Sequence, residues 1–367
     1  MKISPTDSMR ITSLRFILMI FVVFLHAQLP MKYEGALQYV QHFFTLWASP
    51  SVNVFFMISA YLLFLKNDSY IVLLRKKCKG LVIPYLIWPA TYLIIKVFPK
   101  LIASIFFVSF LKNPWKFYTT GWRFVDYMRY FFFYSSDFQH PFWAQFWFLR
   151  QLIFMVLLSP IILFFAKRFC AEFLIILIAI YLGAFNSING KILYVIFSPL
   201  LFFYLGTLCA VYNISFFEVA DKKFKWIFLL PVFILGFILQ HIFLYGNGIF
   251  STITILVACL IILKASVFLI PKQNNEANDI SKDKKYHLYE TLKKLSGFSF
   301  FLYAAHIQIF NPLFSWLYRK FIGIDNDIKL FGHFFFVSIS DIFAAVFLGI
   351  ILKKIFPKLF AIYNGGR

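Results

Sequence analysis

The chain has 367 residues, of which 61% are hydrophobic and only 14% are charged. A soluble globular domain is closer to half apolar and a quarter charged. Water cannot solvate the surface that this composition would expose, whereas lipid can. These proportions exclude a soluble globular protein, and we expect an all-α polytopic membrane protein.

The formal net charge is +21. In membrane proteins Lys and Arg collect in cytoplasmic loops, and that tendency accounts for most of the excess. The basic residues are scattered between apolar segments and do not line one soluble face, so no nucleic-acid partner is expected. The four cysteines show no paired spacing, so we predict neither a disulfide framework nor a metal site.

A membrane-spanning helix needs about 20 mainly apolar residues. The apolar run after Arg15 is longer than the core of a secretion signal and lacks a small-x-small cleavage site, so we expect it to be a retained span. The sequence predicts ten transmembrane helices in one membrane domain. Their windows are 13–29, 43–65, 81–98, 146–166, 170–186, 193–212, 226–245, 249–270, 297–318 and 331–352.

The charged connections predict the orientation. With ten spans, the basic segments fall on one side, which is cytoplasmic by the positive-inside rule, and both termini lie there too. They are 1–15, 66–79, 167–168, 222–225, the loop 271–296 and 353–354. The outer loop 99–145 departs from the pattern, because it also carries five basic residues. It is either an aromatic belt at the bilayer surface or a cap that meets an extracytoplasmic substrate.

Charged groups inside a span are costly and are therefore functional candidates. The first span holds Arg15 and His26, eleven residues apart. In an α-helix that separation is three turns plus roughly 20°, so both side chains lie on one face with a rise of about 16 Å between them. Alternatively, Arg15 extends to the cytoplasmic interface and His26 is an interfacial histidine.

Further polar residues are embedded in the predicted spans. Asn53 and Ser59 suit hydrogen bonds between helices. Asp341 is acidic and lies in mid-span, so it needs a partner, and Arg150 or His306 could supply one. A structural ion pair is the simplest interpretation of Asp341.

Five separated stretches carry recognisable motifs. The first runs from Arg15 to His26, with ten residues between the two. The second, Ser51–Tyr61, contains a Phe-Phe pair and ends in Ser-Ala-Tyr. The third, Arg75–Tyr85, is basic and ends in Pro-Tyr. The fourth is Trp147–Leu149, and the fifth, Ser299–His306, has the pattern Ser-x-x-x-Tyr-x-x-His.

In this order, the five stretches resemble the membrane acyltransferase 3 family over about residues 10–352. Ser51 and Ala60 stand where the family has glycines, and lysines stand where it often has arginine. The resemblance implies transfer of an acyl group, usually acetyl, from cytoplasmic acyl-CoA to a hydroxyl of a glycan or other acceptor. It implies that His26 is catalytic and Arg15 essential. The commonest setting of similar chains is modification of surface polysaccharide, such as O-antigen, at the bacterial inner membrane.

This chemistry suits the residues. A histidine can remove the proton of a sugar hydroxyl as the oxygen attacks the thioester, and we expect His26 to do so. Because about 16 Å separates Arg15 from His26 along the helix, Arg15 cannot share one carbonyl with it. We therefore expect Arg15 to help bind the acetyl-CoA co-substrate; no permanently bound cofactor is expected. The other expected contacts of the CoA phosphates are Arg75, Lys76, Lys77 and Lys79.

Alternatives stay open. The basic segment also obeys the positive-inside rule and needs no ligand to explain it. In a variant mechanism the acyl group passes through an acyl-enzyme, and His306 or Ser299 would carry it, with Tyr303 in support. Trp147 is either an interfacial anchor or a substrate platform.

A proton-coupled transporter or flippase of a glycan-related substrate is the rival function, since buried Arg, His and Asp would suit it. Obvious repeats and helices broken by paired glycines, which would favour it, are absent from the sequence. A sensor or accessory subunit with a dead site is a second rival.

Overall fold

The computed structural model describes residues 3–27, 36–66, 68–92, 94, 143–184, 190–242, 248–271 and 284–366. Within these ranges the secondary structure is helical and contains no strand. The predicted outer loop 99–145 falls almost entirely outside the described residues, as does the stretch 272–283 of the predicted cytoplasmic loop. Two compact units form, one from Met1–Tyr70 and Met155–Gly349, the other from Ile71–Phe154 and Ile350–Arg367. The single membrane domain stays a prediction.

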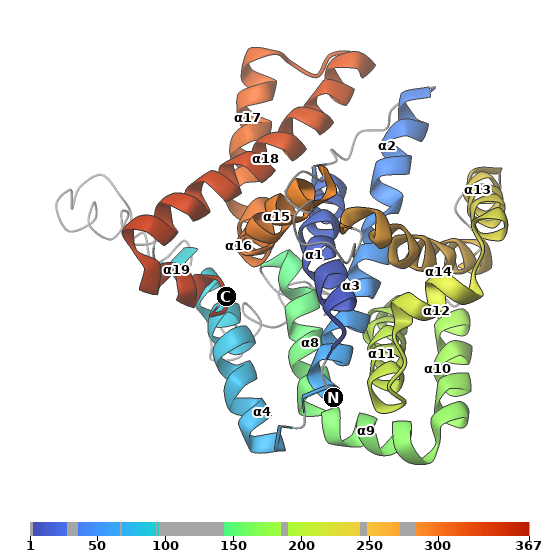
Figure 1. Cartoon of the computed structure of the whole chain (residues 1–367). Coiled ribbons are helices and arrows are strands. Elements are labelled where there is room, and N and C mark those ends of the chain that lie inside the picture. Colours follow the sequence, from blue (N-terminus) through green and yellow to red (C-terminus); the bar gives the residue numbers. More distant parts are fainter. Residues whose placement is uncertain are drawn as a thin grey trace, which may run out of the picture. The chain divides into compact units, whose positions relative to one another are not determined.

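The first unit contains most of the helices (Figure 1). They are α1 (Pro5–His26), α2 (Ala36–Leu46), α3 (Ala48–Phe64), α9 (Ser159–Arg168), α10 (Cys170–Ala184), α11 (Gly190–Val211), α12 (Phe216–Lys223), α13 (Trp226–Ile242), α14 (Gly248–Ala265), η3 (Ser266–Leu269), α15 (Lys284–Ser296), α16 (Ser299–Ala305), η5 (His306–Phe310), α17 (Asn311–Phe321) and most of α18 (Asp327–Ile355).

The second unit is smaller and ends with the C-terminal helix. It comprises most of α4 (Tyr70–Lys77), η1 (Cys78–Val82), helical residues 83–92, η2 (Ala144–Phe146), most of α8 (Trp147–Leu157), the end of α18, and α19 (Pro357–Tyr363). The Trp88 indole nitrogen donates to the Tyr363 carbonyl over 3.0 Å, and the Tyr363 and Thr91 hydroxyls are hydrogen-bonded. These contacts dock α19 on the helix that carries Trp88.

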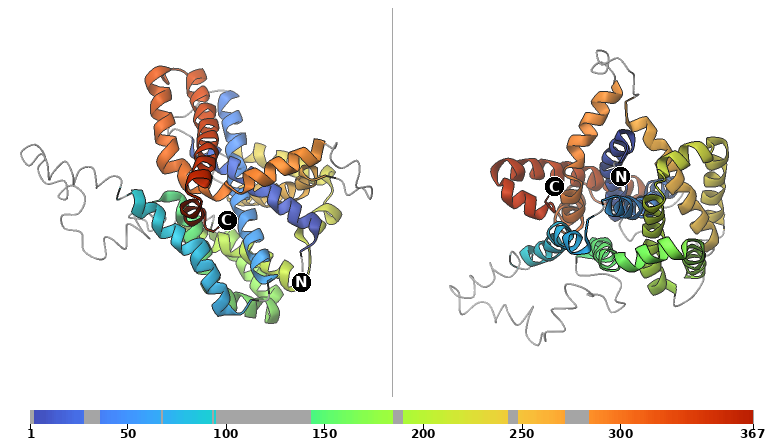
Figure 2. Two further views of the ribbon diagram at one scale, coloured as in Figure 1. Left: turned by 60° about the vertical axis from the view of Figure 1, so that its left-hand side comes forward. Right: turned by 60° about the horizontal axis from the view of Figure 1, so that its bottom comes forward.

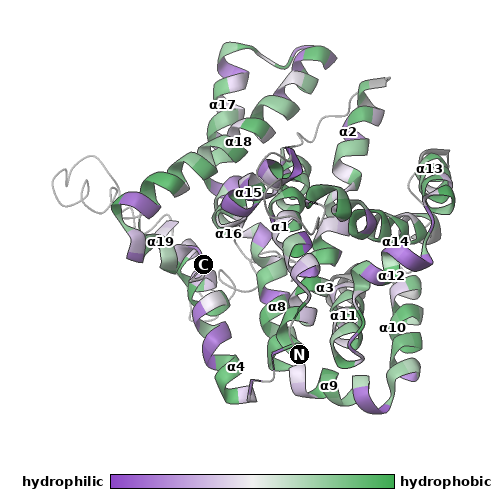
Figure 3. Ribbon diagram, in the orientation of Figure 1, coloured by the Kyte–Doolittle hydropathy of each residue, from purple (hydrophilic) through white to green (hydrophobic). Residues whose placement is uncertain are grey.

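Four helices are long and apolar enough to cross a membrane: Pro5–His26, Tyr39–Phe64, Phe250–Leu269 and Asp327–Ile355. Two bent pairs bring the total to as many as six among the described residues. They are Ala144–Leu157 with Ser159–Arg168, bent by 64°, and Ser198–Val211 with Phe216–Lys223, bent by 94°. In Figure 3 the hydrophobic colour runs along most of α13 and α14. The polytopic membrane class is thereby confirmed, whereas the count of ten and the sides of the termini stay predictions.

The predicted span 297–318 differs most from expectation. It is not one α-helix, because a π-helical turn, His306–Phe310, separates α16 from α17. Within the described residues, the predicted spans 170–186 and 226–245 contain shorter apolar helices, Cys170–Leu182 in α10 and Trp226–Leu239 in α13.

Helix α3 packs against α1 on one side and α11 on another, and Figure 2 gives two further views of this arrangement. One close approach is at Gly206 of α11. A Cβ atom added there would lie 2.2 Å from the carbonyl oxygen of Met57 in α3. Small residues let membrane helices approach in this way. The sequence has Ser51 and Ala60 in α3 where the resembled family has glycine, and the small residue at this contact comes instead from the partner helix.

The end of α1 packs on α18. Phe24 and Ala27 form a buried cluster with Phe334 and Val337. The opposite face of α18 is exposed, with Phe343 72% and Phe347 67% accessible, as expected for a helix side that meets lipid.

The predicted topology can be tested within the first unit. With ten spans, Lys222 lies on the cytoplasmic side and Asp325, between α17 and α18, on the outer side. Reporter fusions at these two positions should therefore report opposite compartments. Equal signals from both fusions would contradict the ten-span arrangement.

Candidate active site

Helix α1 carries the Arg-x10-His motif without interruption. The helix begins at Pro5, where the Ser4 hydroxyl accepts a hydrogen bond of 3.0 Å from the Asp7 amide, and it ends at His26 after 22 residues. Proline is favoured in the first turn and serine as the N-cap. Because one continuous helix joins Arg15 to His26, the two lie on the same face, with a rise of about 16 Å between them. Both side chains are half-buried.

His306 lies beside His26. The centroids of the two imidazole rings are 5.3 Å apart and their planes are tilted by 49°. His306 is fully buried and opens the π-helical turn. Such turns are rare and are frequent at functional sites. Two histidines that lie 280 positions apart in the chain are thus neighbours in space.

The hydrogen bonds of His306 determine which ring nitrogen carries the proton in the neutral form. Nδ1 lies 3.1 Å from the Leu302 carbonyl oxygen and 2.9 Å from that of Tyr303. Carbonyl oxygens only accept, so Nδ1 donates. Nε2 then bears the lone pair, and it is buried without a hydrogen-bond partner in the described part of the chain. The lone pair of Nε2 is therefore held in a fixed orientation at this site.

Asn311 contacts the main chain of both histidines. Its side-chain amide donates to the His26 carbonyl oxygen over 3.0 Å. Its backbone N–H donates to the His306 carbonyl, closing the π-helical turn. Helix ends leave their last carbonyls without partners in the same helix, so the side-chain bond also satisfies the end of α1.

Asp341 is fully buried in α18, on the stripe that contains Phe334 and Val337. Since those two residues pack on the end of α1, the stripe directs Asp341 toward the same region. Neither carboxyl oxygen has a hydrogen-bond partner among the described residues, although the Asn311 amide lies near the group. Among the described residues Asp341 therefore forms no ion pair with His306. The predicted pairing with Arg150, which belongs to the second unit, stays a prediction.

The other predicted side chains are placed as follows. Asn53 is buried in α3 with its Nδ2 unpaired among described residues, while Ser59 is half-buried. The Ser299 hydroxyl is also buried and unpaired within that part of the chain. Because seven residues separate Ser299 from His306, the two lie about 10 Å apart along the axis and do not form a pair. Tyr303 acts through its carbonyl oxygen, which accepts from His306.

The predicted donor-binding residues fall in both units. Arg15, in the first unit, has no hydrogen bond or ion pair with any residue that the structure describes. Four basic residues of the second unit, Arg75, Lys76, Lys77 and Lys79, lie on α4 and η1, and all except Lys77 are exposed. Trp147 opens α8 in the second unit and is half-buried.

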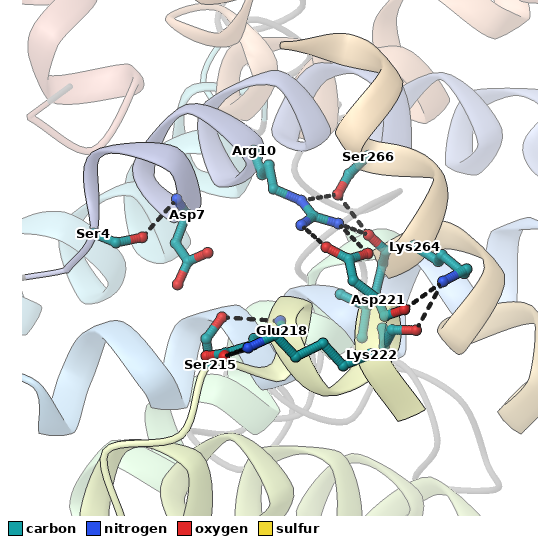
Figure 4. Close-up of polar contacts among 11 residues, drawn as sticks. Ser4, Asp7, Arg10, Ser215, Glu218, Asp221, Lys222, Lys264 and Ser266 are labelled. Atoms are coloured by element: carbon teal, nitrogen blue, oxygen red, sulfur yellow. Dashed lines mark hydrogen bonds and ion pairs between the residues drawn. The ribbon is translucent and has the colours of Figure 1, made fainter. Parts of the chain in front are cut away.

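A buried arginine that the sequence did not single out anchors the beginning of α1 (Figure 4). Arg10 is 3% exposed and pairs with Asp221 of α12 through two bonds of 2.5 and 3.1 Å. It also donates to the Ser266 hydroxyl over 2.7 Å and to the Leu263 carbonyl over 2.6 Å. The guanidinium lies 4.4 Å from the centroid of the Phe217 ring.

The sequence pattern did not predict a role for Arg10, because this residue precedes the first apolar window and its partners lie more than 200 positions away. One signal was present: residue 10, the segment 222–225 and the end of span eight were all predicted to lie on one side. The observed bonds bring Arg10, Asp221 and Ser266 together, as expected for segments on the same side of the membrane.

The comparisons with known proteins place the chain in a family. An acyltransferase domain model matches residues 10–353. The chain therefore belongs to the membrane acyltransferase 3 family, and it is a membrane acyltransferase. The comparisons with curated proteins and with solved structures found no match.

Replacement of Arg10 should test the anchor. Arg10→Ala leaves the partly exposed Asp221 carboxylate and the buried Leu263 carbonyl without their donor, and leaving such groups unsatisfied costs about 1–3 kcal/mol. Lys222→Ala breaks an exposed pair with Glu218, which is worth about 0.5 kcal/mol or less. Thermal unfolding in detergent should therefore show a clear fall for Arg10→Ala and almost none for Lys222→Ala. Equal melting temperatures would show that the Arg10 bonds do not stabilise the fold.

Proposed function

We propose that this acyltransferase is an O-acetyltransferase that moves acetyl from acetyl-CoA to a hydroxyl of a cell-surface glycan or of its lipid-linked precursor. The proposed location is the bacterial inner membrane. The observation that carries the proposal is the pair of imidazole rings, His26 and His306, at a centroid distance of 5.3 Å within an acyltransferase family member.

The pair supplies the base that the reaction needs. A sugar hydroxyl is a poor nucleophile at neutral pH, and an imidazole that takes its proton makes the oxygen reactive. The half-buried His26 is the proposed general base, since it is the more accessible ring. The hydroxyl oxygen attacks the thioester carbonyl while the proton passes to His26. The tetrahedral intermediate then expels the CoA thiolate, and the proton held by His26 passes to the thiolate, which restores neutral His26.

The second ring has a supporting part in this proposal. His306 carries a lone pair on Nε2 and keeps its proton on Nδ1, bound to two carbonyl oxygens. A ring in that state can accept a hydrogen bond from a protonated His26 and so spread the positive charge that forms during attack. A direct nucleophilic role for His306 is the alternative route, in which Nε2 would carry the acetyl group.

Donor binding is proposed for the basic groups. CoA carries phosphate groups, for which Arg and Lys side chains are the usual partners. Arg15 and the segment Arg75–Lys79 are proposed as such contacts. They belong to different units and are therefore tested separately.

The proposal is tested by mass spectrometry of surface glycans from host strains with and without the gene. A third strain carries His26→Ala. Glycans should lose the mass of one acetyl group per modified sugar without the gene, and equally with His26→Ala, because loss of a general base costs about 100-fold or more in rate. The matched control is His287→Ala, which removes an exposed histidine of α15 and should leave acetylation intact. Normal acetylation with His26→Ala would exclude His26 as the base.

A second prediction concerns the donor. Arg15→Lys keeps the charge but loses the planar fork of donors, so the KM for acetyl-CoA should rise while the KM for the acceptor stays constant. Arg75→Ala and Lys79→Ala should raise the same constant. Arg168→Ala, at an exposed arginine of α9, serves as the control. Unchanged donor KM in all three test variants would exclude these residues from CoA binding.

A further inference from the structure

We propose that Asn311 is a positioning residue that holds His26 and His306 at the separation required for them to act as a pair. This inference rests on the proposed function of the two histidines. It adds a residue outside the five sequence motifs, on the segment that joins η5 to α17.

Asn311 makes two hydrogen bonds, one to the main chain of each histidine, and we call this pair of bonds the clamp. The side-chain amide nitrogen of Asn311 donates to the main-chain carbonyl of His26, 3.0 Å away. The backbone N–H of the same residue donates to the main-chain carbonyl of His306. One residue therefore binds the backbone of both histidines, and the distance between their rings depends on it.

Each of the two bonds goes to a carbonyl that lies outside a regular α-helical ladder. His26 is the last residue of α1, so its carbonyl lies beyond the ladder of that helix. The His306 carbonyl would bind the N–H four residues later in an α-helix, but the π turn shifts its partner by one residue to Asn311. In an apolar setting an unpaired carbonyl is costly, so both bonds hold their groups firmly.

The π turn explains why this position carries the clamp. An extra residue in a helical turn rotates everything after it by about 100°. That rotation lets Asn311 bind the His306 carbonyl through its backbone while its side chain reaches α1. The buried Asp341 carboxyl lies near the same amide. The polar groups around Asn311 therefore come from three elements, α1, η5 and α18.

Precise placement of the two rings matters to a reaction of this type. A misplacement of about 1 Å in a catalytic group can cost on the order of 100-fold in rate. Asn311 touches the main chain of the histidines and no reacting atom in this arrangement. Its loss should therefore lower kcat and leave the binding of the acyl-CoA donor unchanged.

The variants follow from these contacts. Asn311→Leu keeps the branching at Cγ and the backbone bond to His306 but removes the donor to His26. Asn311→Gln keeps an amide donor on a longer side chain. The matched control is Ser315→Ala, which removes a buried hydrogen bond of 3.0 Å to His333 one turn further along α17, between α17 and α18.

The first measurement is acetyl transfer by purified full-length protein in nanodiscs. Asn311→Leu should lose about 10-fold or more in kcat with the KM for acetyl-CoA unchanged. Asn311→Gln should retain more activity than Asn311→Leu, and Ser315→Ala should keep wild-type kcat. Thermal unfolding identifies any variant that loses activity by unfolding. Wild-type kcat in a folded Asn311→Leu protein would overturn the proposal.

The second measurement does not depend on catalysis. Diethyl pyrocarbonate acylates accessible imidazoles, and peptide mass spectrometry gives a rate for each histidine. In the wild type His306 should react slowly, because it is fully buried. Asn311→Leu should speed its modification, whereas Ser315→Ala should not. If the wild type transfers acetyl to no acceptor, the proposed function fails. The modification rates still test the positioning role of Asn311 in that case, and an unchanged His306 rate in Asn311→Leu would overturn that role.

Discussion

Helix α1 is held at both ends by hydrogen bonds from segments far away in the sequence, and the candidate site depends on that placement. Near its first turns Arg10 binds Asp221, Leu263 and Ser266. At its last residue the His26 carbonyl accepts from Asn311. Between these ends most of the buried side chains of α1 are apolar. The directional bonds at the ends add a constraint on the position of α1 along its axis.

The two ends differ in how completely their polar atoms are satisfied. Around Arg10, four of the five N–H donors have acceptors, and the fit is that of a structural anchor. Around His26, buried polar atoms lack partners among the described residues, namely His306 Nε2 and both oxygens of Asp341. Buried polar groups in proteins are usually hydrogen-bonded, and exceptions call for a functional explanation. The contrast supports a structural role for Arg10 and the chemistry proposed for His26 and His306.

Sequence reasoning predicted those parts of the molecule that depend on local pattern. The apolar runs gave the membrane class, the eleven-residue spacing gave the shared face of Arg15 and His26, and the ordered motifs gave the family. It failed where partners are distant. Nothing local distinguishes Arg10 from other basic residues near a membrane surface, and the contact between Asn311 and His26 joins positions 285 residues apart. The lack of a hydrogen-bond partner for Asp341 among the described residues was also not predicted, because a mid-span acid suggests a counter-ion.

The π turn His306–Phe310 interrupts an apolar segment that is long enough to form one membrane-spanning helix. The segment from Ser299 to Phe321 contains enough residues for one uninterrupted helix across a bilayer, about 20 being required. The extra residue at His306–Phe310 interrupts that helix and aims one imidazole at another. Deletion of a single residue there would restore a regular helix and direct His306 elsewhere. A change of one residue in length thus decides whether this segment is a regular helix or one that places His306 beside His26.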